Sequence, residues 1–254
     1  NYLDQRLKIN NKPDIIIHLG WGKMIDPWSH YHIKENVNKS IELFKFAKIN
    51  QVKKIIFCGS MNEYADVSGP IHELTKTNKT NKIVTNYAKG KLKVTNYGLD
   101  LFNNSFTQFY VVRPSYVYGP GQKKSSLISQ LFEAYRKSTS LDLTSCNSYR
   151  DYIYVDDVVH LFKLIILHNP KDKGIYNVGS GKCITVKYFV NTIWKTLNAD
   201  PNKLKFNALE DRKEHPQPPS YYDNIKLKLN FKWVPTRTLS QGINQMANEI
   251  LKIQ

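Results

Sequence analysis

Apolar and polar positions alternate along the first half of the chain with two different periods. Short β-branched or aromatic runs that end in small or turn residues predict buried strands, at 14–20, 53–60 and 106–121. Between these runs, apolar residues recur three and four positions apart over 36–50 and 81–102, which predicts helices. Strand, helix, strand, helix, strand in this order predicts an α/β fold with a parallel sheet and crossover helices. We expect the strand at 14–20 to be buried on both faces.

The pattern becomes less regular after residue 120. Five prolines between residues 201 and 235 predict a loop-rich stretch over 200–237. The other elements predicted are a helix at 124–137, a short strand or extended turn at 148–155, a helix at 156–169 with acidic residues at its start, a strand, glycine turn and helix over 174–197, and a last amphipathic helix. At 254 residues and 41% hydrophobic, the chain can form one large domain or a domain with a smaller lobe.

Composition narrows the classes of protein that fit. The longest apolar run, at 161–167, is too short for a membrane span, and no basic-then-apolar leader opens the sequence. The three cysteines are widely spaced and lack a C-x-x-C pair, so neither a disulfide framework nor a zinc site is predicted. We therefore expect a cytoplasmic protein without a membrane span and without a bound metal.

The net charge of +16 raises the alternative of a nucleic-acid-binding protein. The basic residues are spread along the chain, and only 6 of the 37 are arginine, the residue that phosphate and base readers favour. We therefore expect no nucleic-acid partner. The charge still favours an anionic small molecule.

Polar residues follow three predicted strands, where a parallel sheet binds its ligands. They lie in "HLGWG" after the first strand, "CGSMNEY" after the second and "RPSYVYG" after the third. Tyr87 and Lys91 lie on the helix between the last two motifs, and a spacing of four places both side chains on one helix face. The spacing alone is weak evidence, because 16 tyrosines in a lysine-rich chain give about two such pairs by chance, and Tyr222–Lys226 is the second.

The residue types around Tyr87 are suited to proton transfer. A phenol titrates near ~10, and a nearby ammonium or a positively charged cofactor ring lowers that pKa. We expect Lys91 to act on Tyr87 in this way and to donate hydrogen bonds to the ribose hydroxyls of a cofactor. Ser60, at the end of the second strand, is placed to hydrogen-bond the same reacting oxygen.

In this order, the motifs resemble the extended short-chain dehydrogenase/reductase family of nucleotide-sugar epimerases, dehydratases and ketoreductases. The resemblance also includes "RDYIYVDDVV" at 150–159 and "IYNVGSGKCITV" at 175–186. It implies a Rossmann-like doubly wound parallel sheet with a smaller C-terminal α/β substrate lobe. The implied cofactor domain is 1–117, with 150–169 returning to it, and 118–254 forms mainly the sugar-nucleotide lobe.

The resemblance also implies roles for individual residues. It makes Ser60, Tyr87 and Lys91 the catalytic trio, with NAD or NADP as the cofactor and a nucleotide-activated sugar as the substrate. The cofactor-binding positions that it implies are Leu19, Gly20, Asn36, Tyr87, Lys91, Pro114, Ser115, Tyr116 and Val117. The substrate-binding positions are Asn62, Arg150 and Arg212, the two arginines being suited to a diphosphate. A homodimer is compatible with this family.

Two departures from the family pattern bear on function. The glycine-rich G-x-x-G-x-x-G turn and the first β-α-β unit are missing, which indicates either a partial sequence or a protein that has lost its cofactor site. The Asp-Glu pair with which 4,6-dehydratases eliminate water is replaced by Met61 and Asn62, with Glu63 one place late. We therefore expect hydride transfer, most similar to the 4-keto-6-deoxyhexose reductases. A 4-epimerase and a non-catalytic sugar-nucleotide-binding protein remain the alternatives.

Overall fold

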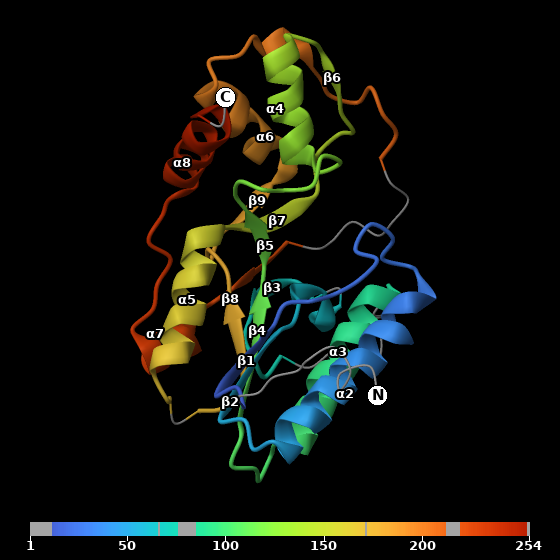
Figure 1. The fold of residues 1–254 in the computed structure, drawn as a ribbon. Helices are drawn as coiled ribbons and strands as arrows, with labels where there is room; N and C mark the ends of the chain where they lie inside the picture. Colours follow the sequence, from blue (N-terminus) through green and yellow to red (C-terminus); the bar gives the residue numbers. More distant parts are fainter. Residues whose placement is uncertain (1–11, 66, 76–84, 171, 212–218, 253–254) are drawn as a thin grey trace.

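The computed structural model describes residues 12–65, 67–75, 85–170, 172–211 and 219–252, and it divides into a larger lobe around a parallel sheet and a smaller lobe above it (Figure 1). The sheet has the order β1-β2-β4-β8, and every neighbouring pair is parallel. Its strands are β1 (Ile15–His18), β2 (Lys54–Cys58), β4 (Gln108–Pro114) and β8 (Gly174–Val178). The predicted α/β fold with a parallel sheet is confirmed.

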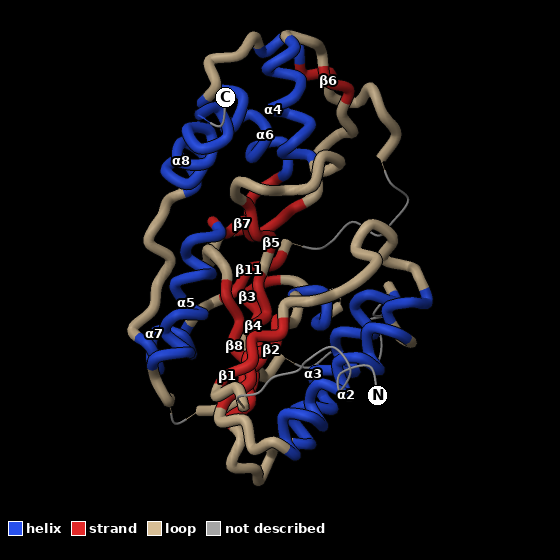
Figure 2. The backbone as a smooth tube through the Cα atoms, in the orientation of Figure 1, coloured by secondary structure: helices blue, strands red, loops and turns tan. Residues whose placement is uncertain are grey.

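Helices cover both faces of this sheet, whose strands run up the middle of Figure 2. The helices α2 (Glu35–Ile49) and α3 (Asn86–Leu101) lie on one side, and α5 (Val155–Leu167) and α7 (Ile225–Phe231) lie on the other. Side chains of a strand point alternately to the two faces, so Phe57 of β2 joins the core under α2 and α3, and Ile56 joins the core under α5. Two apolar layers therefore hold the helices on the sheet.

A buried lysine anchors the end of α5 to the sheet. Lys54 of β2 is 4% exposed, and its Nζ donates to the carbonyl oxygens of Ile165 (2.5 Å), Ile166 (3.1 Å) and His168 (2.9 Å). The last carbonyls of a helix lack partners within the helix and carry partial negative charge, so an ammonium stabilises them. Burial lowers the pKa of Lys54.

The smaller lobe surrounds a second core. It contains the three-stranded sheet β5-β7-β9 and helices α4, α6 and α8, whose buried side chains include Leu131, Phe189 and Trp194. The bounds are β5 (Tyr116–Tyr118), α4 (Leu127–Lys137), β7 (Tyr149–Tyr154), β9 (Cys183–Thr185), α6 (Val186–Thr196) and α8 (Leu239–Lys252). Short parallel pairs complete the description: β3 (Gly69–Ile71) with β11 (Ser220–Tyr222), and β6 (Leu141–Asp142) with β10 (Leu204–Lys205).

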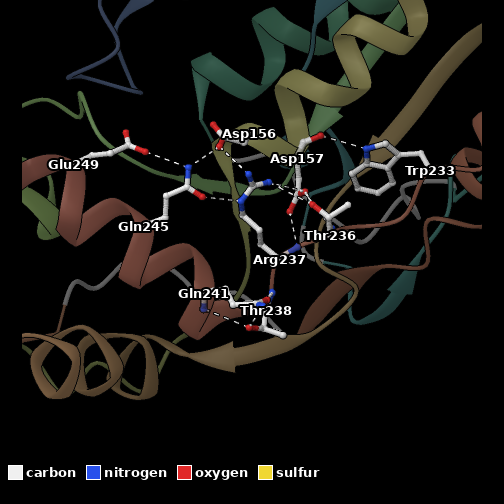
Figure 3. A network of polar contacts seen from close by, with 9 residues as sticks. All are labelled: Asp156, Asp157, Trp233, Thr236, Arg237, Thr238, Gln241, Gln245 and Glu249. Atoms are coloured by element: carbon white, nitrogen blue, oxygen red, sulfur yellow. Dashed lines mark hydrogen bonds and ion pairs between the residues drawn. The ribbon is translucent and has the colours of Figure 1, made fainter.

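The acidic residues predicted at the start of the helix at 156–169 bind one of the segments that connect the two lobes (Figure 3). Asp157 accepts hydrogen bonds from the backbone N–H and hydroxyl of Thr236, and Trp233 Nε1 donates to the Asp157 carbonyl. The Arg237 Nη2 lies 3.1 Å from the Asp156 Oδ2, and the Arg237 Nε donates to the Gln245 Oε1 of α8. These contacts fix the segment 233–238 between α7 and α8 against the first turn of α5.

Two details differ from the sequence expectations, and a third expectation is untested. β1 is not buried on both faces: among the described residues it pairs only with β2, and Ile17 is 41% exposed. The stretch predicted to be loop-rich contains the strand β11 and the helix α7. Both elements are short, and packing on neighbouring elements fixes them rather than the local pattern of apolar residues. The division at residue 117 stays a prediction, although β8 and α7, both from the later segment, pack on the larger sheet.

Candidate active site

The carboxyl ends of β1, β2 and β4 lie at one edge of the sheet, facing the smaller lobe (Figure 1). Leu19 and Gly20 follow β1 and are exposed, Ser60 follows β2, and Ser115 follows β4. Helix α3 begins beside this edge, capped by the Thr85 hydroxyl, which accepts from the Ala88 N–H at 3.2 Å. The edge is where parallel α/β proteins bind ligands.

Ser60 is the first residue of a tight turn. It caps the short 3₁₀ helix η2 (Met61–Tyr64), where its Oγ accepts from the Asn62 N–H at 3.2 Å, and the side chain is 8% exposed. Asn62 itself is exposed. The turn therefore holds the Ser60 hydroxyl at the strand end with one lone pair already used.

Tyr87 lies beside Ser60. Burial raises the pKa of Tyr87 to about 12, and the neighbouring Ser60 side chain acts in the opposite direction. This corrects our expectation that the Lys91 ammonium lowers the pKa of the phenol below 10. The physical reason is that the Tyr87 ring is removed from water, which disfavours phenolate, and Lys91 Nζ lies 5.9 Å from the ring centroid.

Lys91 is one turn further along the same face of α3 and is 3% exposed. Its Nζ donates to the Cys58 carbonyl at 2.7 Å and lies 4.0 Å from the ring centroid of Trp21. Burial lowers the pKa of Lys91 to about 8, although Cys58 and Glu63 act in the opposite direction. The structure therefore brings Ser60, Tyr87 and Lys91 together, as the sequence predicts.

Trp21 was not singled out by the sequence reasoning, although it stands in the quoted motif "HLGWG". Its Nε1 donates to His32 Nδ1 at 2.9 Å, and the His32 Nε2 is 2.8 Å from the Asp26 carbonyl, so the ring proton sits on Nε2. The indole and the His32 ring both contact the Tyr87 ring edge to face. An aromatic wall from the loop after β1 thus closes one side of the trio.

Gly90 explains how this wall comes so close to α3. A Cβ at position 90 would lie 2.6 Å from the His32 carbonyl oxygen, a distance that real Cβ atoms do not reach. A glycine inside a helix costs stability, and here it permits the approach of the 3₁₀ helix η1 (His30–His32). Asn36 holds the same loop: its side chain exchanges two hydrogen bonds with the backbone of Gly22 and is 6% exposed. The predicted contact of Asn36 with a cofactor stays a prediction.

A second set of residues that sequence reasoning missed lies behind Ser60. Glu63 is 1% exposed, and its Oε1 accepts from the Ser60 N–H at 2.7 Å. Its Oε2 accepts from Arg113 of β4 (Nη2, 2.7 Å; Nε, 3.0 Å) and from Thr95 of α3 (2.8 Å). Glu63 and Arg113 are fifty positions apart, so no local pattern could have paired them.

The segment after β4 and the predicted substrate arginine also meet. β5 pairs with β7 in parallel, and the Arg150 guanidinium lies 4.7 Å from the ring centroid of Tyr116. Arg150 is partly exposed and uses one N–H on the Tyr149 carbonyl, which leaves donors of its planar fork for a ligand. Arg212 lies outside the described residues.

A nicotinamide cofactor fits the residues present at this edge. The buried Ser115 hydroxyl has no hydrogen-bond partner among the described residues, and a Cβ built at Gly20 meets nothing within 4 Å. The open space beside Gly20 would accommodate the cofactor. The Ser115 hydroxyl and the Lys91 ammonium would hydrogen-bond its ribose and nicotinamide groups. Within the described part of the chain, no group of three His, Cys, Asp or Glu side chains could hold a metal ion. No helix in that part is both long and apolar enough to span a membrane.

Known proteins are similar to this chain in sequence and in fold. The chain is 29% identical over 147 residues to CDP-abequose synthase of Salmonella typhimurium, covering 56% of this chain and 48% of the synthase. It is 27% identical over 228 residues to dTDP-4-dehydro-6-deoxyglucose reductase of Escherichia coli, covering 85% of this chain and 67% of the reductase. The chain therefore spans about half to two thirds of the length of these relatives.

The fold is also that of a solved structure, UDP-glucose 4-epimerase of Thermotoga maritima with UDP-glucose, with a TM-score of 0.82 at 20% identity over 96% of this chain and 79% of the epimerase. A family model described as the NAD dependent epimerase/dehydratase family matches residues 2–179. With the parallel sheet, the strand-end trio and this match, the chain belongs to the NAD-dependent epimerase/dehydratase family.

Proposed function

We propose that the protein is an NAD(P)-dependent oxidoreductase that reduces the C4 ketone of a nucleotide-activated 6-deoxyhexose. The observation that carries the proposal is the cluster of Ser60, Tyr87 and Lys91 at the strand edge, with the neighbouring acid Glu63 fully engaged elsewhere. Two relatives, named a dTDP-4-dehydro-6-deoxyglucose reductase and a CDP-abequose synthase, support this class of substrate.

Ser60, Tyr87 and Lys91 each have a different role in the proposed ketone reduction. A reduced nicotinamide, when bound, supplies hydride to the carbonyl carbon. The Ser60 hydroxyl donates a hydrogen bond to the carbonyl oxygen, and Tyr87 gives its proton to the same oxygen as negative charge develops there. Burial raises the pKa of Tyr87 to about 12, so the phenol holds its proton at neutral pH and is ready to donate it. Lys91 holds the cofactor ribose.

The state of Glu63 argues against elimination of water. A dehydratase needs a free acid and base beside the catalytic hydroxyl, and in the turn after Ser60 the candidates are Met61, Asn62 and Glu63. Glu63 is buried and bonded to Arg113, Thr95 and the Ser60 N–H, so it has no access to a substrate. The turn therefore supports hydride transfer without elimination.

Arg150 is the residue that we propose binds the diphosphate of the sugar nucleotide. Its guanidinium lies over the Tyr116 ring while several N–H groups remain for phosphate oxygens. Asn62 lies two residues after Ser60 in the same turn and is exposed, and we propose that it contacts the sugar.

The test uses the protein expressed from its complete gene. A nucleoside-diphosphate 4-keto-6-deoxyhexose is mixed with NADH or NADPH, and the absorbance of the reduced nicotinamide is followed while the sugar product is identified by NMR. Stoichiometric loss of NADH or NADPH with formation of the C4 alcohol is the expected result. Failure to bind either cofactor in a fluorescence titration would refute the proposal and leave a non-catalytic sugar-nucleotide-binding protein.

A 4-epimerase is the second candidate. The same three residues would take a proton from a C4 hydroxyl to give a ketone, and would return the proton after the keto sugar has rotated in the site. The fold shared with UDP-glucose 4-epimerase of Thermotoga maritima supports this candidate. The same assay separates the two: an epimerase interconverts two nucleotide sugars without net consumption of NADH or NADPH, whereas a reductase consumes one per product.

A further inference from the structure

The Glu63 carboxylate contacts three elements of the site. Its Oε1 holds the backbone of the Ser60 turn, and its Oε2 accepts from both Arg113 of β4 and Thr95 of α3. The side chains of Glu63 and Arg113 are 0% and 5% exposed, so water does not compete for these contacts. A buried, fully bonded ion pair of this kind is costly to disturb, because removing one partner leaves the other charge unpaired.

Thr95 completes a regular row on α3. Tyr87, Lys91 and Thr95 are each four residues apart, so their side chains lie on one face of the helix. The first two are members of the trio, and the third donates to Glu63 at 2.8 Å from a fully buried position. The same face of α3 is thereby tied to the turn that carries Ser60.

Space around the turn is limited by the same carboxylate. A Cβ at Gly59 would lie 2.6 Å from Glu63 Oε1 and 3.0 Å from the Arg113 side chain, so a glycine is required directly before Ser60. The Arg113 guanidinium is in turn held over the Tyr64 ring at 4.5 Å. The turn, the strand and the helix thus have one arrangement in which all contacts form.

We propose that Glu63 is a positioning residue for the proposed reaction: by bonding Ser60, Thr95 and Arg113 together, it sets the distance between the Ser60 hydroxyl and the Tyr87 phenol. Misplacement of a reacting group by about 1 Å costs up to about 100-fold in rate. The inference rests on the proposed function for its kinetic consequence, whereas the effect of the Glu63 charge on Tyr87, which depends on the same placement of Glu63 beside the phenol, can be measured without turnover.

Glu63 also acts on Tyr87 through its charge. The groups that face the phenol are Lys91 on the same helix, His32 from η1, Cys58 from β2 and Glu63 from η2. Of these, Cys58 and Glu63 raise the pKa of Tyr87 further beyond the effect of burial. A neutral residue at position 63 should therefore lower the pKa of Tyr87.

The first experiment measures the titration of Tyr87 by NMR in protein labelled with ¹³C at tyrosine Cζ, the resonance being assigned by its loss in Tyr87→Phe. We expect the Tyr87 midpoint to shift to lower pH in Glu63→Gln and to stay in place in Asp156→Asn. The control removes one charge from another carboxylate–arginine pair, that between Asp156 of α5 and Arg237 of the segment 233–238 (Figure 3). An unmoved Tyr87 midpoint in Glu63→Gln would overturn the inference.

The second experiment measures turnover. Thr95→Val cuts only the tie between Glu63 and α3 and keeps the buried ion pair, so it remains informative where Glu63→Gln fails to fold. We expect its kcat to fall about tenfold with an unchanged KM, because Thr95 does not touch the substrate, and we expect Thr95→Ser to restore kcat. Wild-type kcat in Thr95→Val would overturn the inference. Absence of turnover in the wild type, with the NMR shift present in Glu63→Gln, would instead refute the proposed function and keep the positioning.

Discussion

The chain contains two tyrosines with a lysine four residues later, and the two pairs have opposite structures. Tyr87 and Lys91 lie on one face of α3, and the Ser60 side chain is close enough to Tyr87 to lower its pKa. Tyr222 ends the strand β11, whereas Lys226 lies in α7. Between them, Asn224 has a φ of 54°, which turns the chain sharply, and its side chain is fixed to Gly179 by two hydrogen bonds.

The partners of the second pair are structural. The Tyr222 side chain is fully buried, and its hydroxyl has no hydrogen-bond partner among the described residues. Lys226 Nζ donates a hydrogen bond to the Ile175 carbonyl at 2.8 Å and lies 4.3 Å from the ring centroid of Tyr176. A spacing of four therefore predicts a functional pair only where both residues share a helix, and the identical spacing across a strand and a helix has no such meaning.

The largest expected difference between the pairs is in turnover. Tyr87→Phe removes one oxygen and keeps the ring, so we expect packing to be preserved while kcat falls by about 10²–10⁴, the usual contribution of a positioned proton-transfer group. Cofactor affinity, measured by fluorescence titration, should hardly change. Tyr222→Phe is the matched control and should keep near-normal kcat; equal losses in both variants would show that the Tyr87 pair has no special role.

The lysines should differ in a second, smaller way. Lys91→Met removes the ammonium that we propose holds the cofactor, and we expect the dissociation constant for NAD(H) or NADP(H) to rise about 10- to 100-fold, the equivalent of about 1.5–3 kcal/mol for a charge-assisted hydrogen bond. Lys226→Met removes contacts to the Lys173 and Ile175 carbonyls and to the Tyr176 ring, all away from the strand edge, so cofactor binding should be unchanged. Weaker binding in both variants would contradict the separation of the two pairs.

The pH dependence of stability sharpens the same comparison. Burial lowers the pKa of Lys91 from 10.5 to about 8, so between these pH values the unfolded chain binds a proton that the folded protein has released. The contribution of Lys91 to the free energy of unfolding should therefore rise with pH across this window, by an amount on the order of 3 kcal/mol. Urea unfolding of the wild type and Lys91→Met gives this contribution as the difference between the two proteins, and a difference that stays flat from pH 8 to 10.5 would refute it.

The smallest effect is expected at the Tyr222 hydroxyl. Because this buried group lacks a partner among the described residues, its removal should cost almost nothing and could remove a desolvation penalty. We expect the free energy of unfolding of Tyr222→Phe to equal or exceed that of the wild type by up to about 1 kcal/mol, measured by urea denaturation. A loss of more than about 1 kcal/mol would show that the hydroxyl is bonded in solution.

Much of the fold could be predicted from local patterns. The helix expected at 36–50 is α2 (Glu35–Ile49), and the strand expected at 53–60 is β2 (Lys54–Cys58), because long periodic segments encode their own element type. The short elements were harder to predict from the sequence. The helix α7 has seven residues and begins at Ile225, inside a stretch that the sequence predicts to be loop-rich. Its position depends on packing against β8, a contact between residues about fifty positions apart.

The trio was predictable for a similar reason, and its surroundings were not. Ser60 follows a strand, and Tyr87 and Lys91 share a helix face, so chain order and periodicity alone place them near one edge of a parallel sheet. The pKa of Tyr87 went in the opposite direction from our expectation, because burial in the folded protein outweighs the neighbouring charge and no sequence pattern measures burial.

The sequence by itself determined the alternation of strands and helices, the family and the positions of Ser60, Tyr87 and Lys91, since these depend on residues close together in the chain. Only the tertiary structure decided which partners Tyr222 and Lys226 have and how Glu63 is used. Glu63 meets Thr95 and Arg113 from thirty-two and fifty positions away, and contacts over such separations exist only once the sheet has brought its strands and helices together.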